Sequence, residues 1–335
     1  MRTAAARSPW APGAQDVSSA LRRMLADRFG CEVADAEAPA RLSGGYDFWV
    51  YGLHFAGPCL PERWAAPLVA RIAPLPERLP LLQRESRVQA WVAAHGYPAP
   101  SVLEVLPPGE LLEYPVQVME RRPGTSIWQA MRAAPRRMLA LSGQLGTCHA
   151  ALHRLPLPEW AGEWTVADEW LRLPRRLAVN GSAPGLAEAL ERIERILPQL
   201  ADGAPALCHG DYGPGNVLLD HGALSVIDWT FAGIADRHGD IARTAWLLLS
   251  VATAAPYPHR PAMRALAPAL SHAYLSAYRR ELPVDAARLR LWTPVHILQN
   301  WAGVVTYEEE PPSRFGVDLA AKLRSRFWRR LNELT

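Results

Sequence analysis

The spacing of hydrophobic and polar positions changes along the chain, and these changes predict segments of different secondary structure. Residues 16–28 carry apolar positions at helical spacing, and Asp16 is placed to cap that helix at its N-terminus. Between residues 41 and 55, two apolar runs flank a Gly-Gly pair, which predicts a strand, a turn and a second strand. The segments that follow are a strand at 67–74, a helix at 79–96, and strands at 100–106 and 114–120. A sheet of about five strands with one helix therefore occupies residues 40–121.

From residue 121 onward the apolar positions recur near a period of 3.6, which predicts helices. The predicted helices span 135–155, 167–179, 186–200 and most of the chain from about residue 240, and short strands at 206–209, 216–220 and 223–228 interrupt them. The fold class is therefore α+β, with a small mixed lobe followed by a larger helical lobe. We expect an N-terminal extension and helix at 1–39, a first lobe at 40–121 and a helical lobe at 122–335.

Composition narrows the classes of function. The chain has 335 residues, of which 49% are hydrophobic, so it can build a sizeable core. A net charge of +3 is too small to argue for a nucleic-acid partner. No apolar run approaches the roughly 18 residues needed to cross a membrane, and the first residues lack the apolar stretch of a secretory signal, so we expect a cytoplasmic protein without a membrane partner. The four cysteines show neither zinc-ligand spacing nor a disulfide framework.

One short stretch concentrates chemistry-bearing residues. The sequence CHGDYGPGN occupies residues 208–216 between two predicted strands, and Asp228 ends the strand after them. A tight turn aims Asp211 and Asn216 to the same side, and the following hairpin brings Asp228 alongside Asn216. Carboxylate and amide oxygens are ligands that suit Mg²⁺, which takes the rest of its shell from waters and substrate phosphates.

This stretch resembles the aminoglycoside phosphotransferase and choline kinase-like families of small-molecule kinases, whose motif is H-G-D-x-x-x-x-N followed by a strand ending in I-D-[FW]. The resemblance implies a protein-kinase-like two-lobe fold with a five-stranded antiparallel sheet in the first lobe. It also implies ATP or GTP as co-substrate and Mg²⁺ as cofactor. By position, Asp211 matches the catalytic base, Asn216 and Asp228 match the metal ligands, and His209 matches the residue that fixes the loop. Asp240 matches an aspartate that stabilises the catalytic loop from the next helix.

The resemblance extends into the first lobe. The residues matching the nucleotide site are Ser43, Gly44 and Gly45 over the phosphates, Arg71 as phosphate ligand, Glu85 as its helical partner, and Met119 and Glu120 at the adenine hinge. Arg71 stands where protein kinases have lysine, and because Lys322 is the chain's single lysine, no alternative lysine exists in this lobe. Thr230 replaces the glycine that follows the metal-binding aspartate in protein kinases, so we expect no flexible activation segment.

Three classes of function stay open. The leading prediction is transfer of a nucleotide γ-phosphoryl group to a hydroxyl of a small molecule, either an antibiotic such as an aminoglycoside or macrolide or a metabolic alcohol such as choline or homoserine. The second is a nucleotide-binding module without catalysis. The third uses the basic side chains of residues 322–330 on an anionic surface, although Leu319, Leu323, Phe327 and Leu331 predict an amphipathic helix whose basic face is merely solvated. We expect a monomer or homodimer.

The acceptor is not determined by the sequence. A cationic acceptor calls for carboxylates, which residues 308–310, Asp285 and Asp318 offer. An apolar acceptor calls for aromatic walls, which Trp246, Trp292 and Trp301 offer, although tryptophans in helices are more often part of the core.

Overall fold

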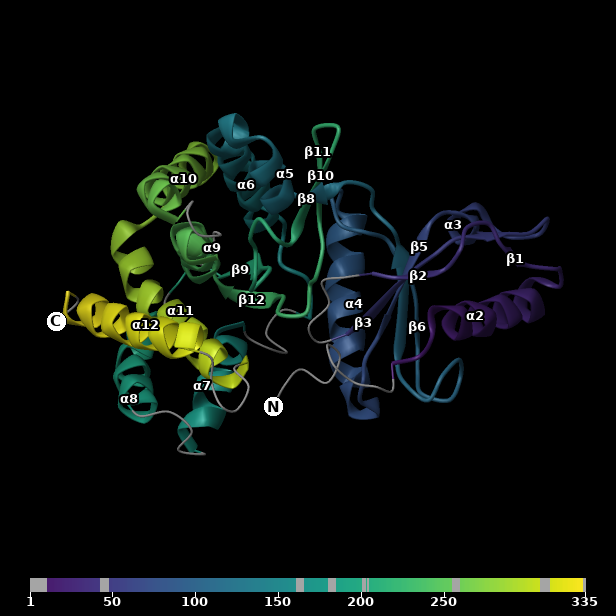
Figure 1. Cartoon of the computed structure of the whole chain (residues 1–335), viewed down its shortest axis with the longest axis horizontal. Coiled ribbons are helices and arrows are strands. Elements are labelled where there is room, and N and C mark those ends of the chain that lie inside the picture. The colour runs from purple at the N-terminus through teal and green to yellow at the C-terminus, as the bar shows by residue number, and fades with distance from the viewer. Residues whose placement is uncertain are drawn as a thin grey trace. The chain divides into compact units, whose positions relative to one another are not determined.

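The structure, a computed structural model, describes residues 11–42, 48–160, 166–179, 185–200, 203, 205–254, 260–307 and 314–333. The chain divides into two compact units, residues 1–123 and 124–335. Figure 1 labels the helices and strands of both units. The expected separation of residues 1–39 from the first lobe stays a prediction.

The first unit contains a single large sheet with helices. Its helices are α2 (Ala14–Phe29), α3 (Glu62–Ala65) and α4 (Leu79–Ala94), and a 3₁₀ turn spans Pro76–Arg78. Its strands are β1 (Ala34–Asp35), β2 (Ala40–Arg41), β3 (Trp49–Leu53), β4 (Phe55–Ala56), β5 (Leu68–Ile72), β6 (Val102–Leu106) and β7 (Val116–Glu120). Five of these strands form an antiparallel sheet in the order β2-β3-β5-β7-β6, which confirms the predicted sheet.

Helix α2 supplies much of the core of this unit. Val17, Leu21 and Leu25, at helical spacing, pack in one buried cluster with Trp49 and Leu68 of the sheet. Burying a leucine side chain contributes about 1.5–3 kcal/mol, so the predicted apolar stripe of α2 fixes the helix to the sheet. The predicted N-cap, Asp16, is wrong by three residues, because the N-cap is Gly13. Asp16 lies inside the first turn and accepts a hydrogen bond from the Gly13 N–H at 3.2 Å, so it caps the helix from within.

The second unit is mainly helical. Its helices are α5 (Ile127–Ala133), α6 (Met138–His153), α7 (Val166–Val179), α8 (Leu186–Ile196), α9 (Arg237–Ala254), α10 (Arg260–Glu281), α11 (Ala286–Tyr307) and α12 (Arg314–Asn332), with 3₁₀ turns at Pro135–Arg137 and Leu197–Leu200. Its strands are β8 (Thr125–Ser126), β9 (Pro205–Cys208), β10 (Val217–Asp220), β11 (Ala223–Val226) and β12 (Gly233–Asp236). Strands β10 and β11 form the predicted hairpin, and β8 pairs with the edge of β10 that faces away from β11. Strand β9 pairs with β12.

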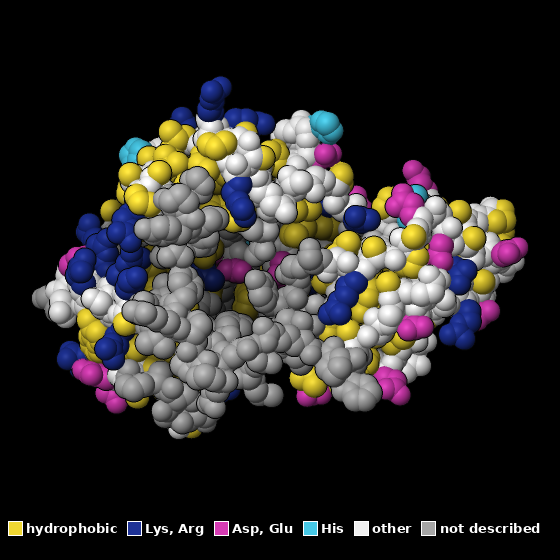
Figure 2. All heavy atoms as spheres, viewed as in Figure 1, with side chains coloured by type: hydrophobic (Ala, Val, Ile, Leu, Met, Phe, Trp, Pro, Cys, Tyr) yellow, Lys and Arg dark blue, Asp and Glu magenta, His cyan; other side chains and the backbone are white. Residues whose placement is uncertain are grey.

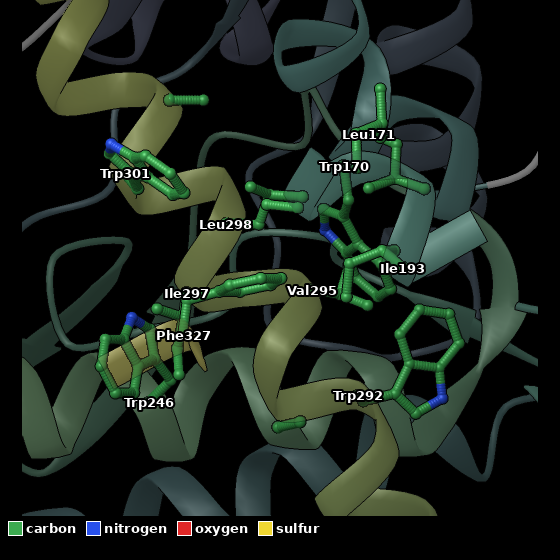
Figure 3. Close-up of a cluster of buried hydrophobic side chains, with 14 of the residues drawn as sticks. Trp170, Leu171, Ile193, Trp246, Trp292, Val295, Ile297, Leu298, Trp301 and Phe327 are labelled. Atoms are coloured by element: carbon green, nitrogen blue, oxygen red, sulfur yellow. The ribbon is translucent and has the colours of Figure 1, made fainter. Parts of the chain in front are cut away.

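Tryptophan side chains build the core of the helical unit (Figure 3). Trp246, Trp292 and Trp301 are 6%, 2% and 3% exposed, within one cluster that also contains Phe327. The interpretation of these three side chains as walls for an apolar acceptor is therefore wrong. Their large surfaces are already buried against other parts of the same unit, so they contribute to stability.

The C-terminal helix α12 is amphipathic, as its sequence predicts. Leu323, Phe327 and Leu331 are buried at a spacing of four residues, whereas Lys322 and Arg324 are exposed. Figure 2 shows basic side chains gathered over the surface of the helical unit. In the part of the chain that the structure describes, no helix combines the length and the apolar character needed to cross a membrane.

Candidate active site

The loop between β9 and β10 holds the predicted catalytic residues in a conformation that depends on Gly210. This glycine has φ +80°, and a Cβ placed on it would lie 2.4 Å from the Phe231 carbonyl oxygen. The Gly210 carbonyl accepts a hydrogen bond of 2.7 Å from the buried indole N–H of Trp170. Only glycine tolerates both the left-handed backbone and this close approach, so the middle residue of His-Gly-Asp is set by the shape of the turn.

Helix α9 holds the backbone of His209, Gly210 and Tyr212 in this loop from one face. Asp240 accepts hydrogen bonds from the backbone N–H groups of His209 at 2.6 Å and Gly210 at 3.0 Å. Thr244, one turn later, donates its hydroxyl to the Tyr212 carbonyl at 2.8 Å. Because residues four apart lie on the same side of a helix, the first two turns of α9 position the whole loop.

Asp240 is the centre of a buried polar cluster. Its Oδ2 atom lies 3.1 Å from Nε2 of His149 and 3.4 Å from Nε2 of His153, and all three side chains are inaccessible to solvent. The Nδ1 atoms of the two histidines each lie 2.7 Å from a tyrosine hydroxyl, that of Tyr274 or that of Tyr278. The imidazoles therefore donate through Nε2 to the carboxylate and accept through Nδ1 from the tyrosines.

The protonation of this cluster follows from burial and charge. Burial lowers the pKa of His149 to about 4, with neighbouring His153 acting in the same direction and Asp240 opposing it. Burial also lowers the pKa of His153. Burial alone would raise the pKa of Asp240, but the two histidines hold it well below its usual range. At neutral pH the cluster is thus a carboxylate with two neutral imidazoles.

The Asp211 carboxylate is held from two sides. The Asn216 amide N–H donates to Asp211 Oδ2 at 3.1 Å and to the Asp211 backbone carbonyl at 3.0 Å. On the other side, the Arg243 guanidinium donates from Nε at 3.1 Å and from Nη2 at 2.9 Å to Oδ1. The side chain of Asp211 is 29% exposed, so one part of the carboxylate faces solvent.

His209 joins the loop to the end of β11. Its Nε2 lies 3.0 Å from the Ile227 carbonyl, and its Nδ1 accepts from the Asp211 N–H at 3.3 Å. These two contacts define the tautomer, because the carbonyl requires a donor and the amide requires an acceptor. The buried imidazole therefore fixes the position of Asp211 relative to the hairpin strand.

The hairpin register places Asn216 opposite Ile227, the residue before Asp228, and a meeting of the Asn216 and Asp228 side chains stays a prediction. Val217 pairs with Val226, and the Ile227 N–H donates to the Asn216 carbonyl at 2.9 Å. Asp228 follows directly, with φ +64°, a left-handed conformation that is uncommon for a residue with a side chain. Thr230 donates its hydroxyl to Asp228 Oδ1 at 2.7 Å. Thr230 thus fixes a carboxylate that is already held by a constrained backbone.

The donor set of Asn216 and Asp228 fits a hard divalent cation. Asn216 uses its amide nitrogen to bond Asp211, so its Oδ1 is the atom that it can offer to a metal ion. Together with a carboxylate from Asp228, this gives two oxygen ligands, the number at which Mg²⁺ is typically completed by phosphates and waters.

In the first unit, Arg71 and Glu85 meet as the sequence predicts. Arg71 Nη1 donates to Glu85 Oε1 and, at 3.1 Å, to Gln117 Oε1. Glu85 is 1% exposed and Arg71 6%, and the guanidinium carbon lies 4.3 Å from the centre of the Phe48 ring. A pair this deeply buried persists only when both partners are present, because either charge alone would lack compensation.

The remaining predicted residues of the first unit are less informative. Met119 and Glu120 end strand β7, and the Glu120 N–H donates to the Ser101 carbonyl at 2.9 Å. The Met119 sulfur lies 3.3 Å from the Gln89 amide nitrogen. The predicted phosphate turn of Ser43, Gly44 and Gly45 lies outside the described residues.

Sequence reasoning missed Arg243, His149 and His153. A signal for each was present. Arg243 follows Asp240 by three residues, and His153 follows His149 by four, so each pair shares one helical face. Of the carboxylates predicted for a cationic acceptor, the structure describes the side chain of Asp285 alone. Asp285 is exposed and accepts from the N–H groups of Ala287 and Arg288 at the start of α11, whereas residues 308–310 and the Asp318 side chain lie outside the described part.

Comparisons with known proteins agree with this arrangement. The profile of APH, the phosphotransferase enzyme family, matches residues 39–292. An aminoglycoside 3'-phosphotransferase from Streptomyces fradiae is 31% identical over 204 residues, which are 53% of this chain and 69% of that protein.

Solved structures share the fold at lower identity. The crystal structure of an aminoglycoside-3'-phosphotransferase of type VIII has a TM-score of 0.56 and 24% identity, covering 85% of this chain and 98% of the other. An amicoumacin kinase in complex with AMP-PNP, Ca²⁺ and Ami has a TM-score of 0.66 and 15% identity, covering 96% of this chain and 100% of the other. These likenesses confirm the predicted protein-kinase-like fold.

Proposed function

Because this chain belongs to the phosphotransferase enzyme family, we propose that it transfers the γ-phosphoryl group of ATP or GTP to a hydroxyl of an antibiotic of the aminoglycoside or macrolide type. It is a kinase that acts on small molecules; the antibiotic class and the nucleotide are the proposal. The antibiotic class is supported by the printed name of the relative from Streptomyces fradiae. Metabolic alcohols such as choline or homoserine are the alternative acceptors.

The observation that carries the proposal is the arrangement of Asp211, Asn216 and Asp228 in the helical unit. The Asp211 side chain is 29% exposed, and its Oδ2 atom accepts from the Asn216 amide nitrogen at 3.1 Å, which leaves Asn216 Oδ1 as the atom that could bind a metal ion. In the reaction, the acceptor oxygen attacks the γ-phosphorus, its proton passes to Asp211, and the bond to the bridging oxygen breaks, so that the nucleoside diphosphate leaves. Mg²⁺ held by Asn216 and Asp228 supplies neutralisation of phosphate charge when bound.

Other residues act by position and charge. His209 fixes Asp211 relative to the hairpin, and Asp240 fixes the loop through two backbone N–H groups. Arg71, oriented by Glu85, is the phosphate ligand of the first unit in this proposal. Its guanidinium offers two parallel donors to phosphate oxygens, which a lysine ammonium does not.

Nucleotide consumption by the purified protein tests the proposal. ATP and GTP are each tried with aminoglycosides, tuberactinomycin-like peptides, macrolides, choline, homoserine and sugars, and ³¹P NMR identifies the phosphorylated product. We expect Asp211→Asn to lower kcat by about 10²- to 10⁴-fold while nucleotide binding persists. Asn216→Ala and Asp228→Ala should instead weaken nucleotide binding only when Mg²⁺ is present.

The outcomes separate the alternatives. Turnover of choline or homoserine alone would overturn the antibiotic class and leave the kinase. Nucleotide binding without turnover of any acceptor would favour a binding module. An Asp211→Asn variant with wild-type kcat would contradict the role of the base.

A further inference from the structure

Arg243 occupies an unusual place in the helical unit. Asp240 and Thr244 on α9 hold the backbone of the catalytic loop, but Arg243, on the same helical face, holds the Asp211 carboxylate itself. The Arg243 side chain is 11% exposed and its third nitrogen, Nη1, donates to Asn300 Oδ1 of α11 at 3.2 Å. A guanidinium that is hydrogen-bonded to both Asp211 and Asn300 has a fixed orientation, unlike a mobile charge on the surface.

The two carboxylate oxygens of Asp211 accept different numbers of hydrogen bonds. A carboxylate oxygen has about two acceptor sites. Oδ1 receives two N–H donors from Arg243, so both of its sites are used. Among the residues that the structure describes, Oδ2 receives one donor, from Asn216 at 3.1 Å, and keeps one site. The oxygen available to an acceptor hydroxyl is therefore Oδ2, beside the residue assigned to the metal.

We propose that Arg243 is a positioning residue for phosphoryl transfer, which occupies Asp211 Oδ1 and so presents Oδ2 to the hydroxyl of the acceptor. This inference rests on the proposed function. The acceptor O–H proton passes to Oδ2 as its oxygen bonds to the γ-phosphorus, and the electron pair of the broken bond leaves with the nucleoside diphosphate. Without Arg243, the carboxylate can rotate about its side-chain torsion, and either oxygen can meet the hydroxyl.

Two substitutions of Arg243 separate the effect of its charge from the effect of its hydrogen-bond geometry. Arg243→Met removes the charge and both N–H donors while keeping a similar length, and Arg243→Lys keeps the charge but cannot place two donors on one oxygen. A misplacement of about 1 Å costs roughly 10²-fold in rate. We therefore expect Arg243→Met to lower kcat by about 10²-fold with the KM for nucleotide unchanged, and Arg243→Lys to recover part of that loss.

A matched control tests the loss of an arginine by itself. Arg154 of α6 lies in the same unit and forms an ion pair with Glu281, but its side chain is 47% exposed. Arg154→Met should leave kcat at the wild-type value, since exposed pairs contribute little and Arg154 contacts no residue of the loop in the described part of the chain.

A double-mutant cycle tests the contact without any acceptor. Urea unfolding is measured for wild type, Asp211→Asn, Arg243→Met and the double variant. We expect the two single effects to be non-additive, because each single variant leaves a half-buried charge without its partner and the double variant leaves neither.

The failure of this inference differs from the failure of the proposed function. Additive effects in the cycle, or wild-type kcat in Arg243→Met, would overturn the positioning role while the kinase stands. A rise in nucleotide KM at constant kcat would also overturn it, because binding and not the base would then be affected. If wild-type protein turns over none of the acceptors, the proposed function fails and this inference fails with it.

Discussion

The buried histidines predict a loss of stability in mild acid. His149 and His296 are fully buried, and burial lowers their pKa values to about 4 and about 3. In the unfolded chain a histidine titrates near 6.5. Between these values the unfolded state binds protons that the native state does not, so the free energy of unfolding must fall as the pH falls from about 6.5 towards 4.

The magnitude follows from the two pKa values of each group. Linkage gives about 2 kcal/mol of lost stability for each of His149 and His296 between pH 7 and pH 5. Their sum, about 4 kcal/mol, is a large part of the 5–15 kcal/mol typical of folded domains. Asp240 acts in a lower window. Because its pKa is depressed, its stabilisation is present above about pH 4 and is lost only as the pH falls further.

Urea unfolding at pH 7, 6 and 5, followed by far-ultraviolet circular dichroism, measures this dependence. His149→Gln keeps an N–H donor for Asp240 but cannot take up a proton, so its stability should fall less steeply than that of wild type, by about 1 kcal/mol per pH unit near pH 5.5. His221→Gln is the matched control, because that side chain is 98% exposed and lies in the hairpin turn. If His149→Gln and wild type lose stability equally, His149 is not a neutral, buried imidazole in the native state.

Two further substitutions test other parts of the structure. Gly210→Ala forces a Cβ against the Phe231 carbonyl at a left-handed residue, so we expect a loss of more than 1 kcal/mol by urea unfolding together with a lower kcat; a fully active, equally stable variant would contradict the loop geometry. Arg71→Ala leaves Glu85 buried without its cation and should cost about 3–5 kcal/mol and raise nucleotide KM. Arg28→Ala, at the more exposed pair with Glu104, should cost less than about 1 kcal/mol, and equal losses in the two variants would refute the distinction.

The fold was largely predictable because its elements obey local rules. The sheet strands and α2 have strong apolar periodicity, and their predicted positions agree with β3, β5, β6, β7 and α2. Strands β8 and β12 were not predicted, because β8 has two residues and β12 four, and each pairs with a strand distant in the chain. Strands this short carry too little periodicity to be distinguished from a loop.

In the candidate site, too, the parts set by local sequence were predictable and the parts set by tertiary packing were not. The loop residues follow from one contiguous motif, and the hairpin register places Asn216 opposite Ile227, the residue before Asp228, by local pairing. The polar cluster around Asp240 combines α6, α9 and α10, which are far apart in sequence. The spacing of four residues places His149 and His153 on one helical face, but it does not tell whether that face meets a core carboxylate or solvent, so their buried state emerges from tertiary packing.

Arg71 and Arg243, two cations of the proposed site, each contact a carboxylate. Arg71 binds Glu85 and Gln117 from one nitrogen while its plane lies over Phe48, and Arg243 places two donors on one oxygen of Asp211 and a third on Asn300. A lysine carries its donors on a single nitrogen and has no plane to stack, so it cannot lie flat over Phe48 as Arg71 does, nor donate from three nitrogens as Arg243 does. Arginine to lysine, ordinarily a conservative exchange, is here the change that separates the requirement for charge from the requirement for geometry.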